Sequence, residues 1–417
     1  MVKMKDSGIE WIGEIPETWE IVPIFYCANV VNDKNQKLVE KHTLKFTYGE
    51  IVDKVTYNEE TTDDILETIR NYTIVKKNDI MINGLNLAFD FVTQRVGKVN
   101  TPGAITSAYM AIRTNDRTTP RYLTYLFKTY DNLKAFHNMG GGVRKILNYK
   151  ELSKQKILLP PKSEQQQIAD FLDHKTAEID GLIDKINTEI DTLKQYQSSV
   201  ITQAVTKGLD PNVPMKDSGI EWIGEIPETW KMVKIKHLVN TVNLKDKLSN
   251  LNSRYIGLEN VEKGTGKLIM TATTYPDEIY KICKKGNVLY SKLRPNLAKV
   301  LIAPFDSCCT SEFEVLNTFN NRWIKYCLLS NGITEMTTAA TYGVKMPRVN
   351  WEEVSNYKIP VPKNDEIEFI NNYIDSKMLT VDNLIKQKQQ QINQLTEYKN
   401  SLIFEYVTGK KQVKEAN

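Results

Sequence analysis

Cysteine and histidine are scarce in this sequence, and their spacing argues against two kinds of site. The 417 residues contain five cysteines and four histidines. An odd cysteine count without C-x-x-C spacing argues against a disulfide framework, so we expect reduced thiols. The histidines lack the paired spacing of zinc ligands, so no metal site is expected. The cysteines are Cys27, Cys283, Cys308, Cys309 and Cys327, and the histidines are His42, His137, His174 and His237.

Long hydrophobic runs are absent as well. No apolar stretch approaches the roughly 18 residues that a membrane helix needs, so we expect neither a signal peptide nor a membrane anchor. With 41% hydrophobic and 25% charged residues, the composition is that of a globular protein with two or more domains.

Catalytic motifs are the third absence. Gly264-Thr265-Gly266-Lys267 is not a Walker loop, because Val261 replaces its first glycine and Leu268 replaces the magnesium-binding Ser or Thr. The tetrad of amino-methyltransferases begins with Asn or Asp before two prolines. Neither residue precedes Pro160-Pro161, so the tetrad is absent. The sequence therefore predicts a binding protein, and no catalytic residue is assigned.

The most conspicuous feature that is present is an internal repeat. Residues 4–19, MKDSGIEWIGEIPETW, recur letter for letter as residues 215–230. Sixteen identical residues with two tryptophans indicate a duplication. We call each copy a joint. We interpret its Trp and Ile side chains as packing groups in preference to a ligand site.

Two long amphipathic segments accompany the joints. Residues 163–207 carry apolar side chains at spacings of three and four, which predicts a helix of roughly 68 Å with a coiled-coil seam. We expect Ser163 to cap its start and Gly208 to stop it. Residues 374–406 repeat the pattern at an offset of 202, so we expect the two helices to pair with each other. An intermolecular coiled coil is the alternative.

The remaining segments, residues 20–155 and 231–357, resemble each other only in short pieces. Short β-branched and aromatic runs alternate with turn residues, and residues 120–136 and 322–336 read as helices. The predicted fold is therefore α+β, with two globular domains separated by two long antiparallel coiled-coil helices in a pseudo-twofold duplication. The expected boundaries are 1–155 for the first domain, 156–210 for the central helix, 211–357 for the second domain and 358–417 for the final helix and tail.

Positive charge is concentrated in the two globular domains. The net charge is +4 for residues 20–155 (19 basic, 15 acidic) and +7 for residues 231–357 (18 basic, 11 acidic). Residues 156–230 carry −6 (7 basic, 13 acidic). Basic domains on an acidic spacer favour a polyanionic partner, and nucleic acid is favoured over a membrane surface.

Candidate contact loops contain the residue types that bind phosphates and base edges. In the first domain the candidates are Asn83, Asn86, Arg95, Lys98, Arg144 and Lys145, beside the glycine run 140–142. In the second domain they are Ser291, Lys292, Arg294, Asn296, Lys299, Lys345 and Arg348.

The order of joint, variable domain, long helix and repeat resembles the specificity subunit of type I restriction–modification systems over essentially the whole chain. Residues 8–16, the Pro161-x-x-Glu164-Gln165 start of the first helix and Ser291-Lys292-Leu293-Arg294-Pro295 are typical of that family. The second helix starts differently, with Asn364-Asp365-Glu366-Ile367 in place of Ser-Glu-Gln-Gln, so a weaker cap is expected there.

This resemblance implies two target recognition domains, each reading one half of a bipartite site in double-stranded DNA. The helices would dock two methyltransferase subunits and, through them, restriction subunits. The chain itself would bind no cofactor, since S-adenosylmethionine belongs to the methyltransferase partner and ATP with Mg2+ to the restriction partner. It would act in the cytoplasm of a bacterium or archaeon. Two alternatives are a fused restriction–methylation enzyme and a coiled-coil adaptor without a DNA role.

Overall fold

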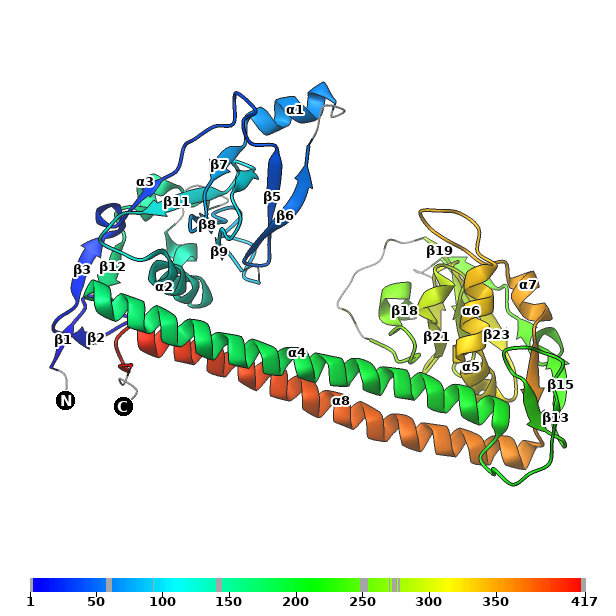
Figure 1. The fold of residues 1–417 in the computed structure, drawn as a ribbon. Coiled ribbons are helices and arrows are strands. Elements are labelled where there is room, and N and C mark those ends of the chain that lie inside the picture. Colours follow the sequence, from blue (N-terminus) through cyan, green and yellow to red (C-terminus); the bar gives the residue numbers. More distant parts are fainter. Residues whose placement is uncertain are drawn as a thin grey trace. The chain divides into compact units, whose positions relative to one another are not determined.

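The computed structural model describes residues 3–57, 62–92, 94–139, 145–247, 254–269, 271, 276 and 278–413. It divides into two compact units, Met1–Lys185 with Gln391–Asn417, and Ile186–Gln390. The long helices α4 (Lys162–Lys207) and α8 (Asn364–Val407) contribute to both units (Figure 1). Within the described residues no helix is both long enough and apolar enough to cross a membrane.

The first unit contains two four-stranded sheets. One has the order β4-β11-β8-β9, all antiparallel: Ala28–Val30, Met110–Thr114, Ile80–Ile82 and Val96–Lys98. The other has the order β6-β5-β10-β7: Glu50–Thr56, His42–Thr47, Gly103–Ile105 and Thr73–Val75, with β10 parallel to β5. A small cluster that includes Val75, Met81 and Ile105 is buried beneath these strands.

The second unit repeats this plan with one change. The sheet β16-β23-β20-β21 (Asn240–Thr241, Phe313–Asn317, Val288–Ser291 and Val300–Ile302) matches β4-β11-β8-β9 strand for strand. The other sheet, β17-β19-β22-β18 (Lys245–Lys247, Ile279–Cys283, Ser307–Cys309 and Arg254–Ile256), again has one parallel pair. Its extra edge strand β17 lies on β19, whereas β6 of the first unit lies on β5. The duplication thus keeps three strands of this sheet and moves the fourth.

The helices mostly agree with their predicted positions. In the first unit α2 is Pro120–Asn132, followed by the 3-10 turn η2 (Ala135–Asn138), and α1 (Asp63–Arg70) and α3 (Tyr149–Leu152) are short. In the second unit the helix expected at residues 322–336 is two helices, α5 (Asn321–Leu329) and α6 (Asn331–Ala339), because Ser330 has an extended backbone. Helix α4 begins at Lys162, so Ser163 lies inside its first turn and is not the expected cap.

Each joint packs against the ends of the long helices. The first joint forms the hairpin β1 (Met4–Asp6) and β2 (Glu14–Pro16), and the second forms β13 (Met215–Asp217) and β14 (Glu225–Pro227). The indole of Trp19 donates to Glu164 at the start of α4 (3.0 Å), and that of Trp230 donates to Glu366 at the start of α8 (2.9 Å). Both tryptophans are buried, so the packing interpretation of the joints is confirmed.

The opposite helix end completes each joint. Gly409, just after α8, has a left-handed φ of 73°, and a Cβ there would lie 2.4 Å from the Pro16 ring. Gly208, just after α4, has a φ of 74°, and a Cβ there would meet Trp230 at 3.2 Å. Only glycine therefore fits either helix end without rearrangement. After each joint a two-stranded sheet leads to the next helix: β3 (Glu20–Pro23) with β12 (Lys156–Leu159), and β15 (Lys231–Lys234) with β24 (Lys358–Val361).

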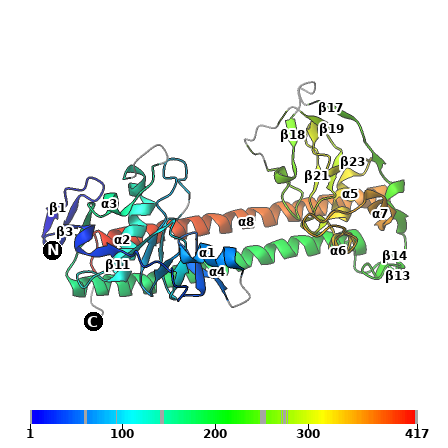
Figure 2. The same ribbon diagram turned by 90° about the horizontal axis from the view of Figure 1, so that it is seen from above.

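Helices α4 and α8 run antiparallel and side by side within each unit (Figures 1 and 2). In the first unit Lys399 Nζ lies 2.6 Å from Asp180 Oδ1. In the second unit the amide of Gln197 donates to Asp382 Oδ1 (2.7 Å). The offset of 202 relates Asp180 to Asp382 and Gln197 to Lys399, so the two contacts are copies of one another. The predicted pairing within one chain is confirmed.

Candidate nucleic-acid interface

Two predicted contact loops of the second unit form one surface. One loop follows β20 and leads into the 3-10 turn η6 (Pro295–Leu297), and the other precedes α7 (Trp351–Asn356). The amide of Arg294 donates to the Pro347 carbonyl (2.8 Å), and the amide of Val349 donates to the Lys292 carbonyl (3.0 Å). Residues about fifty positions apart in sequence are therefore joined by backbone hydrogen bonds.

Ion pairs with Glu312 and Glu314, at the start of β23, hold these loops in place. The Arg348 guanidinium donates twice to the Glu312 carboxylate (3.1 and 2.7 Å), and these hydrogen bonds raise the pKa of Arg348. The Lys292 ammonium lies 3.2 Å from Glu314, a carboxylate that is buried and also pairs with Lys281 (3.2 Å). Arg348 and Lys292 thus have partners inside the protein, and we regard them as positioning residues.

Two other predicted DNA contacts of this unit, Ser291 and Lys299, instead bond backbone carbonyls of the protein. Ser291 is only 2% exposed, and its hydroxyl donates to the Leu293 carbonyl (2.8 Å). The Lys299 ammonium donates to the Leu258 carbonyl (2.7 Å). Ser291 therefore supplies a donor to a carbonyl of its own loop, and Lys299 ties the loop to the 3-10 turn η5 (Leu258–Asn260), so both side chains have partners within the protein.

Three candidates of the second unit remain free to meet a partner. Arg294, Asn296 and Lys345 are exposed, and no other described residue forms an ion pair or side-chain hydrogen bond with them. Arg294 has a left-handed backbone with a φ of 49°. That conformation is uncommon for a residue with a Cβ, and here the backbone bond to Pro347 fixes it.

The first unit builds the same loop pair. The amide of Leu147 donates to the Gly84 carbonyl (2.9 Å), and the amide of Leu87 donates to the Lys145 carbonyl (3.1 Å). A Cβ on Gly84 would lie 2.4 Å from the Leu147 carbonyl oxygen, so the close approach of the two loops requires glycine.

Asn86 holds the place in this loop that Arg294 holds in the second unit. Its φ of 54° is also left-handed, and its side chain is exposed, as is that of Lys145. Asn83 is half-buried, and its side-chain oxygen accepts the Leu85 amide (3.1 Å). Arg144 and the glycine run 140–142 lie outside the described residues.

Arg95 is the clearest correction among the predicted contacts. Its side chain is completely buried, and its guanidinium donates to the carbonyls of Asn83 (3.0 Å), Leu85 (2.7 Å) and Asp90 (2.8 Å). It also lies 3.4 Å from the Asp90 carboxylate. A side chain with no exposed surface cannot reach DNA in this conformation, so Arg95 organises the loop from inside.

Lys98 also lies away from the contact loop. It lines a cavity of about 430 Å³ formed by β6, β9, α2 and the two long helices of the first unit. Lys128, from α2, lines the same cavity, and burial lowers its pKa, with a smaller effect from Lys399. Lys98 is therefore placed beside the helices and not with Asn86 and Lys145.

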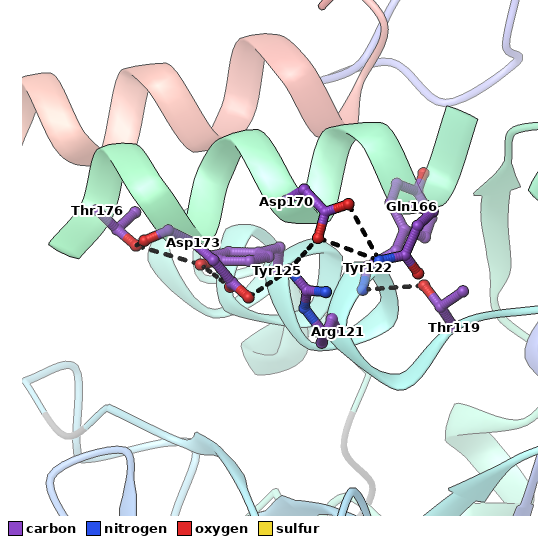
Figure 3. A network of polar contacts seen from close by, with 8 residues as sticks. All are labelled: Thr119, Arg121, Tyr122, Tyr125, Gln166, Asp170, Asp173 and Thr176. Carbon is purple, nitrogen blue, oxygen red and sulfur yellow. Dashed lines mark hydrogen bonds and ion pairs between the residues drawn. The ribbon is translucent and has the colours of Figure 1, made fainter. Parts of the chain in front are cut away.

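The globular part of the first unit is fastened to α4 by a polar network (Figure 3). Arg121 of α2 donates to Asp170 (2.8 Å) and pairs with Asp173 (2.5 Å), and the Tyr125 hydroxyl donates to Asp173 (2.7 Å). At the start of α4 the buried Gln165 accepts from Thr118 (3.0 Å) and donates to the Pro160 carbonyl (2.9 Å).

The start of α8 solves the same problem differently. By the offset of 202, Glu366 takes the place of Glu164 and keeps the bond to the joint tryptophan. Ile367 replaces Gln165 and is buried. The sequence departure at residues 364–367 thus keeps the joint contact and exchanges a hydrogen-bonded amide for an apolar contact.

Sequence reasoning missed the buried carboxylates that position the cations. Glu314 lies inside an apolar strand, and Asp79 of the first unit is 1% exposed and accepts two bonds from Arg113 (2.8 and 2.7 Å). A charged residue inside a predicted buried strand was the available signal, because such a group is retained only when it is paired.

Comparison with known proteins shows the family of this chain. The family described as "Type I restriction modification DNA specificity domain" matches residues 16–192 and again residues 227–397. The MjaVIII specificity subunit of Methanocaldococcus jannaschii is 23% identical over 426 residues, which cover 97% of this chain and 95% of that protein. The putative MjaX specificity subunit of the same organism is 24% identical and covers 97% and 96%.

A solved structure shares the fold. A chain from a study of complex assembly and conformational transition in the type I R-M system has a TM-score of 0.63 at 13% identity, with 94% of this chain and 98% of that chain covered. The chain therefore belongs to the type I restriction–modification DNA specificity family. It is a specificity subunit with two target recognition domains, one in each unit.

Proposed function

We propose that each domain reads one half of a bipartite DNA target through its paired loops. In the second domain Arg294, Asn296 and Lys345 make the contacts, and in the first domain Asn86 and Lys145 do so. The phosphate backbone accepts charge-assisted bonds from the cations, and base edges in the major groove accept bonds from Arg and Asn.

One observation carries this proposal: the same loop pair is built twice from different residues. Asn86 and Arg294 share a left-handed backbone and an exposed side chain, and each follows the central strand of the matching sheet. A rigid support with variable side chains is what sequence-specific readout requires, because the support sets position and the side chains set the choice of base.

The helices offer docking sites for two methyltransferase subunits. Leu182 and Leu384 are exposed on α4 and α8, and so are Tyr196 and Tyr398, and the offset of 202 relates the members of each pair. Asp180 lies on the side of α4 that faces the cavity beside α2 and β9. Leu182 is two residues further along, which is about 200° around the helix, so it lies on the opposite side of α4. An exposed Leu and Tyr occurring in matching copies supports one identical partner per unit.

Chemistry is assigned to the partners. This chain positions DNA and catalyses no step, the methyltransferase subunits supply S-adenosylmethionine, and the restriction subunits supply ATP hydrolysis with Mg2+. Because chromosomal DNA is the target, the complex works in the cytoplasm of a bacterium or archaeon.

A domain exchange tests the proposal. Residues 231–357 would be replaced by the matching segment of a relative, and methylome sequencing would then compare the targets in cells that carry the methyltransferase partner. We expect one half-site to change and the other to stay, because each domain has its own loop pair. A simultaneous change of both half-sites would contradict independent readout.

Purified proteins separate this function from its alternatives. The chain alone should bind DNA weakly and transfer no methyl group, and addition of the methyltransferase subunit should give tight, site-specific binding and methylation. Methylation or cleavage by the chain alone would establish a fused enzyme. Association with the methyltransferase partner without DNA binding by either domain would establish an adaptor.

A further inference from the structure

In the second unit, the contact loop that precedes α7 forms a protruding hairpin, residues 342–348. It lies beside the contact loop that follows β20. Its two ends are closed by a reciprocal pair of backbone hydrogen bonds: the Tyr342 amide donates to the Arg348 carbonyl (2.9 Å), and the Arg348 amide donates to the Tyr342 carbonyl (3.0 Å). Gly343 turns the chain with a φ of 85°. The base is fixed by the Arg348–Glu312 ion pair, so the tip projects from a rigid support.

The tip is unusually apolar for a surface segment. Val344 is 103% exposed, and Tyr342 and Met346 are 60% and 48% exposed. No described residue covers Val344. Val344 keeps its whole apolar side chain in water, and Tyr342 and Met346 keep about half of theirs, which is unfavourable unless a partner covers them.

The charges around the tip indicate the kind of partner. Lys345 lies between Val344 and Met346 in the sequence, and Arg294 extends from the neighbouring loop, both without a carboxylate partner among the described residues. Glu312 and Glu314, the nearby acids, are already paired with Arg348 and Lys292. Surfaces that bind proteins are depleted of lysine at their centre, whereas this one has apolar groups flanked by free cations, which favours DNA.

We propose that Val344 is a specificity-determining residue that packs against the C5-methyl group of a thymine in the half-site of the second domain. This rests on the proposed function. A branched aliphatic side chain cannot hydrogen-bond a base edge, and the thymine methyl is the apolar group that the major groove presents. Lys345 and Arg294 bind the adjacent phosphates or a guanine and hold Val344 in the groove.

Uracil substitution tests this contact at the level of one methyl group. The complex with the methyltransferase partner would be titrated with duplexes in which deoxyuridine replaces each thymidine of the second half-site in turn. At one position, replacement of thymidine by deoxyuridine should weaken binding of the complex about threefold to fivefold, which is the effect of one buried methyl group. Val344→Ala should weaken binding to the thymine duplex similarly and should bind the thymine and uracil duplexes equally.

Controls keep the outcomes distinct. Phe319 is 106% exposed beyond the other end of β23, so Phe319→Ala is the matched loss of an exposed apolar group and should change nothing. Thermal unfolding of Val344→Ala should match that of the parent protein, because the side chain has no internal contacts to lose. Uracil indifference at every thymine, or loss of methyltransferase association in Val344→Ala, would overturn the inference. Absence of any bipartite target would instead refute the proposed function itself.

Discussion

Replacement of Arg95 by alanine distinguishes a DNA contact from an internal support. Its guanidinium holds three carbonyls of residues 83–90 at 2.7–3.0 Å and has no exposed surface. Removal of the guanidinium takes a charged donor from three carbonyls, and each polar group left unsatisfied costs about 1–3 kcal/mol, which gives a total of about 3–5 kcal/mol. Arg95→Ala should therefore destabilise the first unit by about that amount and release the loop that presents Asn86.

Two measurements read this effect separately. Hydrogen exchange of the amides in residues 83–92 should accelerate, and urea unfolding of the first unit should move to lower denaturant. Arg70→Ala, which removes an exposed arginine of the same unit, should cost at most about 1 kcal/mol. Normal stability and normal exchange in Arg95→Ala, combined with loss of first-half-site binding, would refute the reasoning and restore Arg95 as a DNA contact.

Three further changes test the interface and the helix attachments. Arg294→Ala should weaken binding by about 1–3 kcal/mol and relax one base position if the guanidinium reads a guanine, or weaken all sequences equally and reduce the salt dependence if it binds a phosphate; salt-dependent titrations distinguish these, and unchanged affinity removes Arg294 from the interface. Burial raises the pKa of Glu164, so the folded protein disfavours the charged carboxylate and loses stability as pH rises through the folded pKa. Glu164→Gln keeps an acceptor for Trp19 and should be at least as stable as the parent at neutral pH. Glu164→Ala should be less stable in thermal unfolding. Burial lowers the pKa of Lys128, so its penalty is full at low pH and fades as pH rises through the folded pKa; Lys128→Met should raise the unfolding temperature at neutral pH, and the gain should shrink toward the pKa of a free lysine, whereas a pH-independent gain would point to packing.

The sequence predicted the fold to the extent that it repeats itself. The identical joints revealed the duplication, and the apolar periodicity placed α4 within one residue of its start. The helix at residues 322–336 was predicted as one element, whereas the extended backbone of Ser330 divides it into two. The exchange of β6 for β17 could not be predicted, since edge-strand pairing depends on long-range register.

The structure brings the candidate contact loops of each unit together, which the sequence did not predict, and their individual side chains were not separable by type. Arg95 and Arg294 are both arginines in Asn-containing loops, yet one is buried and one is exposed. What distinguishes them is the number of backbone carbonyls that the turn leaves without donors. That number follows from the three-dimensional path of the loop and has no signature in composition.

The identical joints and the divergent domains have one physical explanation. Each joint contacts the start of one long helix through a Trp–Glu hydrogen bond. It contacts the end of the other helix at a glycine, where an added Cβ would clash with the ring of Pro16 or Trp230. A change in the joint must therefore satisfy two helix ends at once, whereas a change in an exposed side chain of a contact loop affects only that loop. Residues 20–155 and 231–357 can consequently differ in their exposed loop side chains, and even in an edge strand, without disturbing the helix pair.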